Sequence, residues 1–498
     1  MTCKADCHLK HWAAEVSDLH GLKHVAGKGS WFRRGVWLLL FLGGLFWSGR
    51  LNYLVFKDYF SYGRSTILDV DYKEELTFPA ITICNFNKYR ESLITANDIV
   101  NVGVHLGIVD SNFEVIDEQL YTEEFVSRIN AVNWTDYEED PNFDMVEFTN
   151  RTGHQIDEMI VQCEFGGQEC TADDFEHVFT HQGNCFTFNG YKEGYTLHES
   201  KRAGAANGLK LVLDADTPEY TPSNDLDGDA LDAGFRIAVH HNNEPPYVRE
   251  LGLSIGPGVH SFITMQREHV TALPAPFTTC EESGNVQYYD HYSLQACRIE
   301  CETLAVVTVC GCKLVEQPGP AAVCNASDSH ECAHPTLVNF MNGQLTGVEE
   351  CECQTPCDLH YYPIAVSSAK LRPTFIEKTF ENTTSSNMSI AYISDNIAVT
   401  TIYYEALNMR KIDIVAATGW FDVLSSLGGN FGLFLGASLL TIVQFLEYLV
   451  DECMYTFSKK KKVEPDDEER PAENGVAMKV QDVDEPEKKD DAWTTEYS

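Results

Sequence analysis

Two long apolar stretches divide an otherwise polar chain of 498 residues. Residues 35–56 and residues 420–452 each contain enough apolar residues, about 20, to cross a lipid bilayer as a helix. Between them, the polar and loosely patterned segment 91–160 predicts helices and loops. Alternating or β-branched runs predict strands at residues 78–87, 210–216, 235–241 and 396–406. We therefore predict an α+β membrane protein with a large mixed domain, residues 57–419, between two transmembrane helices.

Basic residues on the outer flanks of the apolar stretches predict how the chain crosses the membrane. Arg33 and Arg34 precede the first stretch, and a run of four lysines, 459–462, follows the second. Because basic flanks stay in the cytoplasm, residues 1–34 and 453–498 are predicted to be cytoplasmic and the central domain to lie outside. We predict the plasma membrane as the location. A cleaved signal peptide is the alternative for the first stretch, but no small-residue cleavage site follows it. The charged, proline-rich C-terminal tail is predicted to be disordered.

Cysteines and glycosylation sequons agree with an extracellular central domain. Fourteen of the 17 cysteines lie between Cys84 and Cys357, and an even number in an oxidising compartment predicts disulfides. The CGC and CEC motifs lack the spacing of a tetrahedral zinc site, so we predict no metal site. Sequons in the central domain occur at Asn133, Asn150, Asn325, Asn382 and Asn387.

Charge and motif content argue against other functions. The net charge of −39 argues against nucleic acid as a partner, because phosphates repel an acidic surface. No paired nucleophile and base suggests an enzyme, and we predict no cofactor. One acidic run predicts either a solvated loop or a patch that attracts Ca²⁺. It is not a complete EF-hand loop, because it lacks the final glutamate of that motif. Its members are Asp225, Asp227, Asp229 and Asp232.

Six sequence motifs occur in order between residues 17 and 455. They are LHGLKHV, LTFPAITICNFNKYR, ADDFEHVFTHQGNCFTFN, EPPYVRELGLSIGPG, YYEALN and LGGNFGLFLGASLLT. With them the chain resembles the degenerin/epithelial sodium channel family, most closely its acid-sensing ion channel branch. The resemblance implies a homotrimer or heterotrimer with a palm β-sheet, a β-ball, a knuckle, and a helical finger and thumb. It also implies the disulfides Cys84–Cys185, Cys163–Cys170, Cys280–Cys357, Cys297–Cys353, Cys301–Cys351, Cys310–Cys332 and Cys312–Cys324.

Small residues in the middle of the second apolar stretch are candidates for a selectivity filter. By pattern alone, Gly436, Ala437 and Ser438 favour close helix packing. The resemblance implies instead that they interrupt the helix and line the narrowest part of the pore. Glu447 would form a carboxylate ring in a trimer, unless it is simply solvated at a helix end. Gln444 stands where related channels usually have an acid, which implies a weaker preference for Na⁺ over K⁺.

The resemblance assigns further residues to the pore and to the junction above it. His20 and Gly21 match a re-entrant loop that lines the inner pore, although the pair alone would predict only a turn. Ser425 and Ser426 match the outer mouth, where a bulky group at the first position holds such channels open. The resemblance implies that an aromatic pair, Tyr62 and Phe277, transmits motion of the thumb to the pore. By pattern alone, these two residues would indicate ordinary packing.

Proton sensing requires carboxylates close enough to raise one another's pKa. The resemblance aligns several acidic positions of the family with other residues here: Lys210, His334, Val338, Thr401 and Arg410. The remaining candidates for a sensor are Asp227, Asp229, Asp232, His334 and Glu405. Histidine is a candidate because its usual pKa lies nearest to neutral pH.

Three functions fit these observations. The first is a ligand-gated, amiloride-sensitive sodium channel that is opened by protons. The second keeps the same pore but opens it with a peptide, Ca²⁺ or another ligand, or leaves it constitutively open. The third is a two-span receptor that conducts no ions.

Overall fold

The computed structural model describes residues 19–192, 194–221, 232–282, 284–345, 351–380 and 388–460. Four residues predicted as sensor or sequon sites lie outside these ranges: Asp227, Asp229, Asn382 and Asn387. The chain divides into a larger unit, Phe56–Val423, and a smaller unit made from its two ends, Met1–Val55 and Leu424–Ser498. The larger unit contains the sheets, and the smaller one contains most of the apolar helices.

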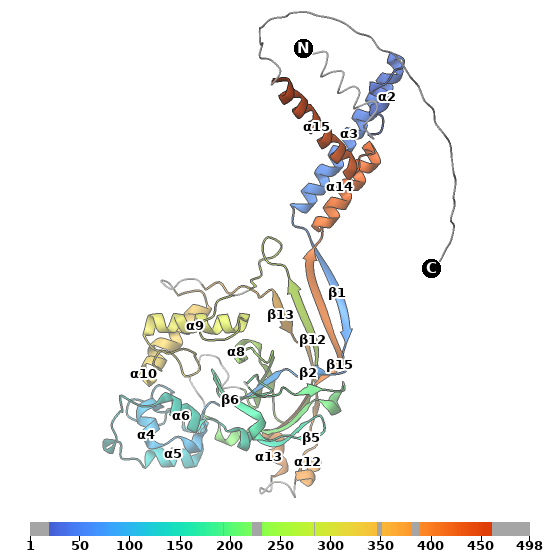
Figure 1. Ribbon diagram of the computed structural model, residues 1–498. Helices are drawn as coiled ribbons and strands as arrows, with labels where there is room; N and C mark the ends of the chain where they lie inside the picture. The colour runs from blue at the N-terminus through green and yellow to red at the C-terminus, as the bar shows by residue number, and fades with distance from the viewer. Residues whose placement is uncertain are drawn as a thin grey trace, which may run out of the picture. The chain divides into compact units, whose positions relative to one another are not determined.

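The larger unit is built on an eight-stranded sheet, which we call the palm sheet (Figure 1). Its strand order is β13-β12-β15-β9-β4-β5, with β1 paired to β15 and β14 paired to β12. The bounds are β1 Arg64–Tyr72, β4 Ile160–Phe165, β5 Gln168–Glu169, β9 Leu209–Asp214, β12 Val259–Ala272, β13 Asp358–Tyr361, β14 Ile364–Lys370 and β15 Ile397–Ala416. β15 is 20 residues long and pairs with β1 in antiparallel and with β12 in parallel orientation. The predicted strand at 396–406 is therefore only the first half of β15.

A five-stranded sheet, β11-β10-β3-β7-β6, packs near the palm sheet, and β2 pairs with β8. The bounds are β2 Leu76–Thr77, β3 Ala80–Asn85, β6 Phe175–Thr180, β7 Gly183–Phe188, β8 Glu199–Ser200, β10 Phe235–His240 and β11 Leu253–Ile255. The core shared by the two sheets centres on Phe78, which is fully buried. Its ring lies 5.0 Å from that of Phe165 and 6.1 Å from that of Tyr404, centroid to centroid.

Helices form two clusters beside the sheets. The finger cluster contains α4 Ala96–Asp98, α5 Glu123–Asn130, α6 Met145–Thr152 and α7 Ile156–Met159. The thumb cluster contains α9 Leu294–Cys310, α10 Ala326–Asp328 and α11 His334–Met341. Three further helices are α8 Val248–Leu251, α12 Pro373–Phe380 and α13 Ile390–Asn396. Side-chain oxygens begin several of these helices: Thr122 accepts from the Phe125 amide in α5, and Ser293 from the Ala296 amide in α9.

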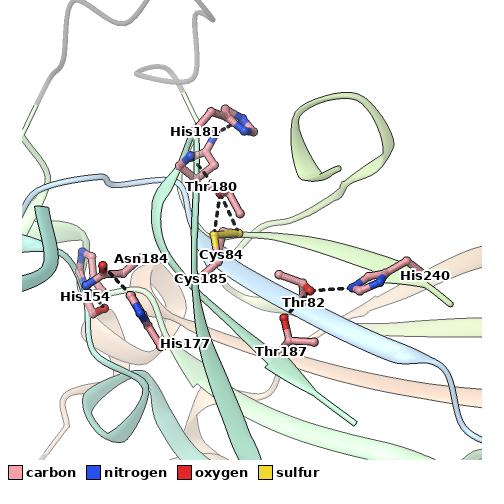
Figure 2. The surroundings of a disulfide bond; sticks show 11 residues. Thr82, Cys84, His154, His177, Thr180, His181, Asn184, Cys185, Thr187 and His240 are labelled. Atoms are coloured by element: carbon pink, nitrogen blue, oxygen red, sulfur yellow. Dashed lines mark hydrogen bonds between the residues drawn. A yellow bond between two sulfur atoms is a disulfide. The ribbon is translucent and has the colours of Figure 1, made fainter. Parts of the chain in front are cut away.

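Seven disulfides tie the larger unit together, and their pairing is the one that the resemblance implies. Cys84 and Cys185 are directly opposite in β3 and β7 and join the middle of the five-stranded sheet (Figure 2). Cys163–Cys170 closes the hairpin of β4 and β5. The other five lie in the thumb cluster and its base, where the apolar core is small and cross-links add most.

The smaller unit contains α2 Leu22–Ala26, most of α3 Trp31–Tyr59 and α14 Trp420–Leu435, and α15 Leu439–Lys460. Among the described residues, α3 is long and apolar enough to cross a membrane, whereas α14 and α15 meet that criterion only as a pair bent by 75°. The buried residues of α3 are the polar Ser48 and Asn52, while most of its large apolar side chains are exposed. This inverted pattern suits a helix that faces lipid.

The helices can be compared with the two predicted apolar stretches. The first stretch, predicted as 35–56, lies within α3, which begins four residues earlier and ends three residues later. The second, predicted as 420–452 with a belt of small residues that the resemblance implies interrupts the helix, corresponds to α14 and α15, which are separated at residues 436–438.

Replacing Phe78 with alanine should lower the free energy of unfolding by about 3–5 kcal/mol, because a fully buried ring leaves a cavity between the sheets. The measurement is the thermal unfolding midpoint of detergent-purified protein. Phe375→Ala is the matched control, since Phe375 is 69% exposed and should change the midpoint little. Equal midpoints for the two variants would contradict this assignment of the core.

Candidate functional site: a broken apolar helix and candidate sensor residues

The break between α14 and α15 follows from the three small residues that form it. Gly436 has φ of +64°, a left-handed conformation that glycine adopts without strain. Two residues later, Ser438 begins α15: its hydroxyl accepts from the Thr441 amide at 3.3 Å, and its own amide donates to Thr441 Oγ1 at 3.1 Å. This reciprocal exchange follows the pattern of a capping box, with Thr441 in the place of the usual glutamate or glutamine. Glycine thus ends one helix and serine begins the next.

His20 and Gly21 close over this break. The His20 amide donates to the carbonyl of Leu435 at 2.7 Å, which satisfies a group that the end of α14 leaves free. A Cβ on Gly436 would lie 2.5 Å from the His20 ring, so only glycine fits there. Gly21 itself is left-handed, with φ of +84°, and begins α2. The structure therefore brings together two of the sequence's pore candidates, His20–Gly21 and Gly436–Ser438.

Close backbone contact and polar side chains join α3 to α14. A Cβ on Gly44 would lie 2.9 Å from the carbonyl oxygen of Phe434, so the two helices approach closely at a glycine. The side-chain amide of Asn430 donates to Asn52 Oδ1 at 2.8 Å. The side-chain amide of Asn52 in turn donates to Ser48 Oγ at 3.4 Å. Sequence analysis missed this polar ladder, although a serine and an asparagine spaced four apart in an apolar stretch were its signal.

The other pore candidates lie on the two halves of the broken helix. Ser425 and Ser426 are exposed near the start of α14. Gln444 is half-buried, and Glu447, one turn further along α15, is exposed. The two share one helical face, because residues three apart are neighbours on a helix.

The aromatic pair Tyr62 and Phe277 is in contact. Their rings lie 5.5 Å apart, centroid to centroid, and are perpendicular. Tyr62 lies between α3 and β1, and the nearby Ala417 amide donates to the Gly63 carbonyl at 2.8 Å. The two strands that lead from and to the membrane helices are thus joined at this point.

The predicted sensor residue His334 lines a cavity of about 280 Å³ between the finger and thumb clusters. His105 and His330 also line it, with ring centroids 5.7 Å apart. Glu316 is the only carboxylate among the described lining residues. The cavity thus has few acids and several imidazoles.

The other sensor positions that the structure describes lie on the palm sheet or, for Asp232, beside the five-stranded sheet, and they do not form an acidic cluster. Thr401 on β15 is the register partner of Lys210 on β9 and shares a hydrogen bond of 2.9 Å with His260. Arg410 forms an ion pair with Glu268. Glu405 is exposed and accepts from Gln266 at 2.9 Å, and Asp232 is exposed beside the five-stranded sheet.

Sequence analysis missed a carboxylate cluster at the end of β9, which we call the Asp216 cluster: Asp214, Asp216 and Glu219. Burial, aided by the charges of Asp214 and Glu219, raises the pKa of Asp216 to about 6. Burial also raises the pKa of Asp214, whose carboxylate accepts from the Tyr392 hydroxyl at 3.0 Å. Elsewhere, burial raises the pKa of Glu244 to about 7.

Two buried histidines differ from the sensor candidates, because burial lowers the pKa of each. Burial lowers the pKa of His154 to about 3 and that of His240 to about 4. His240 shares a hydrogen bond of 2.8 Å with Thr82 in the five-stranded sheet, beside the buried disulfide (Figure 2). Burial thus disfavours the charged form of both rings.

Comparison with known proteins decides the family. Residues 13–448 match the family described as Amiloride-sensitive sodium channel. The chain belongs to this family. It is 34% identical to acid-sensing ion channel 1 of Gallus gallus over 483 residues, covering 94% of this chain and 89% of that protein. It is 36% identical to acid-sensing ion channel 2 of Rattus norvegicus over 453 residues, covering 88% and 85%.

A solved structure gives a weaker likeness. The cryo-EM structure of a proton-activated chloride channel is matched over 85% of this chain and 96% of that chain, with a TM-score of 0.28 and 6% identity. Values this low support no argument about the fold. The assignment to the amiloride-sensitive sodium channel family therefore rests on the sequence matches.

Gly436→Ala tests the geometry of the break in this family member. A residue with a Cβ in the left-handed conformation costs about 1–2 kcal/mol, and here it also collides with His20, so current per surface channel should fall about tenfold or more. Gly428→Ala is the control, since nothing lies within 4 Å of its added Cβ. Current is measured under voltage clamp and divided by surface expression. Undiminished current in Gly436→Ala would contradict the proposed role of the break.

Proposed function

We propose that the chain is a subunit of a trimeric, amiloride-sensitive cation channel of the plasma membrane that conducts Na⁺ and opens in response to extracellular protons. Its partners are two further copies or related subunits, and membrane lipid. The observation that carries the proposal is the break at Gly436–Ser438, in a chain that belongs to a sodium channel family.

The pore part of the proposal follows from backbone chemistry. Irregular backbone within a membrane is tolerated only where it faces water or protein. In a trimer, three copies of Gly436–Ser438 would surround one axis, and their carbonyl oxygens would replace water around a passing Na⁺. Glu447 would add a ring of three carboxylates below, while Gln444 would leave the neighbouring ring uncharged and weaken selection of Na⁺ over K⁺.

Proton gating is supported by carboxyl groups that titrate in the relevant range. The pKa of Asp216, about 6, lies between neutral and acidic extracellular pH. Protonation would neutralise one of several close negative charges and change the hydrogen bonds of Tyr392. Raised pKa values of this kind cluster at functional sites, although ordinary charge networks produce them too.

A chain of direct contacts leads from the Asp216 cluster toward the membrane. Thr217, which follows Asp216 in the chain, donates to Asn396 Oδ1 from its amide at 2.6 Å and from its hydroxyl at 2.8 Å. Asn396 ends α13, and β15 begins at the next residue. β15 then runs to Ala416, four residues before α14. A shift of α13 on protonation would therefore act on the strand that leads into the pore helix.

A second candidate keeps the pore and changes the ligand. Lys210 and Thr401 face each other where the resemblance expects carboxylates, and the finger–thumb cavity has few acids. A peptide or Ca²⁺ as the gating ligand, or a constitutively open pore, fits these substitutions better than the usual acid-sensing pocket does. A two-span receptor without a pore is the remaining alternative.

Recording from oocytes that express the chain separates these candidates. A step from pH 7.4 to pH 5 should evoke an inward Na⁺ current that amiloride blocks. Current at rest, or with a neuropeptide but not with acid, would support the second candidate. Silence under every condition, with surface expression verified, would overturn the channel proposal for the homomer.

Asp216→Asn tests the proposed sensor. The folded domain holds a proton on Asp216 that the unfolded chain releases, so this group's contribution to stability is complete below its usual pKa of 3.8 and is lost as pH rises through about 6. The substitution should make the acid response less steep and reduce the change in unfolding midpoint between pH 5 and pH 7. Asp157→Asn, at an exposed site, is the control. If both measurements match the unsubstituted chain, Asp216 is not a sensor.

Ser425→Cys tests the outer mouth. A bulky, charged methanethiosulfonate reagent on an exposed cysteine there should hold the pore open and convert a transient current into a sustained one. The same reagent on the unsubstituted chain and on Ser92→Cys, exposed in the finger, provides the controls. A current that remains transient after modification would argue against placing Ser425 at the mouth.

A further inference from the structure

Three imidazole rings stack at the edge of the palm sheet. His269 on β12 and His360 on β13 are register partners, and their ring centroids lie 4.4 Å apart. His241, just after β10, stacks on the other side of His360 at 4.5 Å. Because these residues come from three distant parts of the sequence, the fold alone brings them together.

A carboxylate completes a ligand set beside the stack. Asp358 lies diagonally across the two strands, and its Oδ1 is 2.6 Å from His269 Nε2. One ligand atom each from His269, Asp358 and His360 lies within 4.8 Å of the other two. Two imidazoles and one carboxylate are a common protein ligand set for Zn²⁺, which then takes water in a fourth position.

One nitrogen of this group lacks a partner. His360 Nδ1 is buried from solvent and has no hydrogen bond among the described residues. A buried polar atom left in this way costs about 1–3 kcal/mol unless something binds it. The ion pair of Asp358 with His269 offers little in return, because the Asp358 side chain is 71% exposed. Stabilisation of the fold therefore does not explain why these side chains lie together.

We propose that His269, His360 and Asp358 form a binding site for a divalent transition metal ion, Zn²⁺ in the first instance. The ion clamps β13 to β12 beside Cys357, the residue that ties the thumb base through its disulfide with Cys280. Ligand atoms around tetrahedral zinc are about 3.3 Å apart, so the two rings must turn toward the ion from their stacked arrangement.

The charges around the site both favour and oppose a cation. Asp358 supplies a negative charge on the solvent side. Arg267 lies two residues before His269 on β12 and adds a positive charge near the site. That charge weakens the attraction for a cation. We therefore expect micromolar rather than nanomolar affinity.

The test is a calorimetric titration of Zn²⁺ into the full-length chain, purified in detergent and stripped of metal. One saturable ion per chain is expected. Asp358→Asn and His360→Ala should each weaken binding about tenfold or more, and His291→Ala, at an exposed histidine elsewhere, should leave it unchanged. No saturable binding, or equal affinity in all variants, would overturn the proposal.

A second readout guards against a misfolded His360→Ala variant. Zn²⁺ that binds only the folded chain raises its unfolding midpoint, and Asp358→Asn should abolish that rise while keeping the metal-free midpoint, since its side chain is mostly exposed. A rise that persists in Asp358→Asn would contradict the site. Neither readout uses ionic current, so the result is independent of the proposed channel function.

Discussion

The pairing of β15 is the interaction on which the rest of the molecule depends. Over its 20 residues, the strand pairs with β1, β9 and β12, which come from the start and the middle of the domain. β1 begins five residues after the end of α3, and β15 ends four residues before α14 begins, so one pair of strands is linked through short segments to both of these apolar helices.

The second constraint is the cost of unsatisfied backbone groups in a membrane. A helix that breaks at Gly436 leaves carbonyls and amides without partners, and each is expensive in lipid. Several of these groups form hydrogen bonds within the smaller unit: the Leu435 carbonyl accepts from the His20 amide, and Ser438 exchanges hydrogen bonds with Thr441. These hydrogen bonds stabilise the break between the two helices.

Sequence reasoning succeeded where the signal was local or was carried by recognisable motifs. The apolar stretches, the strands around 78–87 and 235–241, and the disulfide pairing were all predicted, the last through the resemblance. The break at Gly436 was implied by the resemblance, but its cause, a left-handed φ next to the His20 ring, depends on contacts with a residue more than 400 positions away.

The Asp216 cluster and the histidine stack could not be predicted for the same reason. Asp214 and Tyr392 are 178 residues apart, and a raised pKa arises from burial that no sequence motif encodes. His241, His269 and His360 carry no metal-binding spacing along the chain; only the pairing of β12 with β13 brings two of them together. The limit of sequence-based prediction is clearest for the candidate acid-sensing residues. The positions that the resemblance indicates are substituted, and the carboxylates with a raised pKa lie elsewhere in the chain.

The most direct test of the account is a recording from the purified chain reconstituted alone in a lipid bilayer. The account predicts a cation current whose reversal potential follows the Na⁺ gradient and whose size rises when the side facing the larger unit is acidified. Reconstituted, correctly folded protein that leaves the bilayer electrically silent at every pH and with every candidate ligand would contradict it.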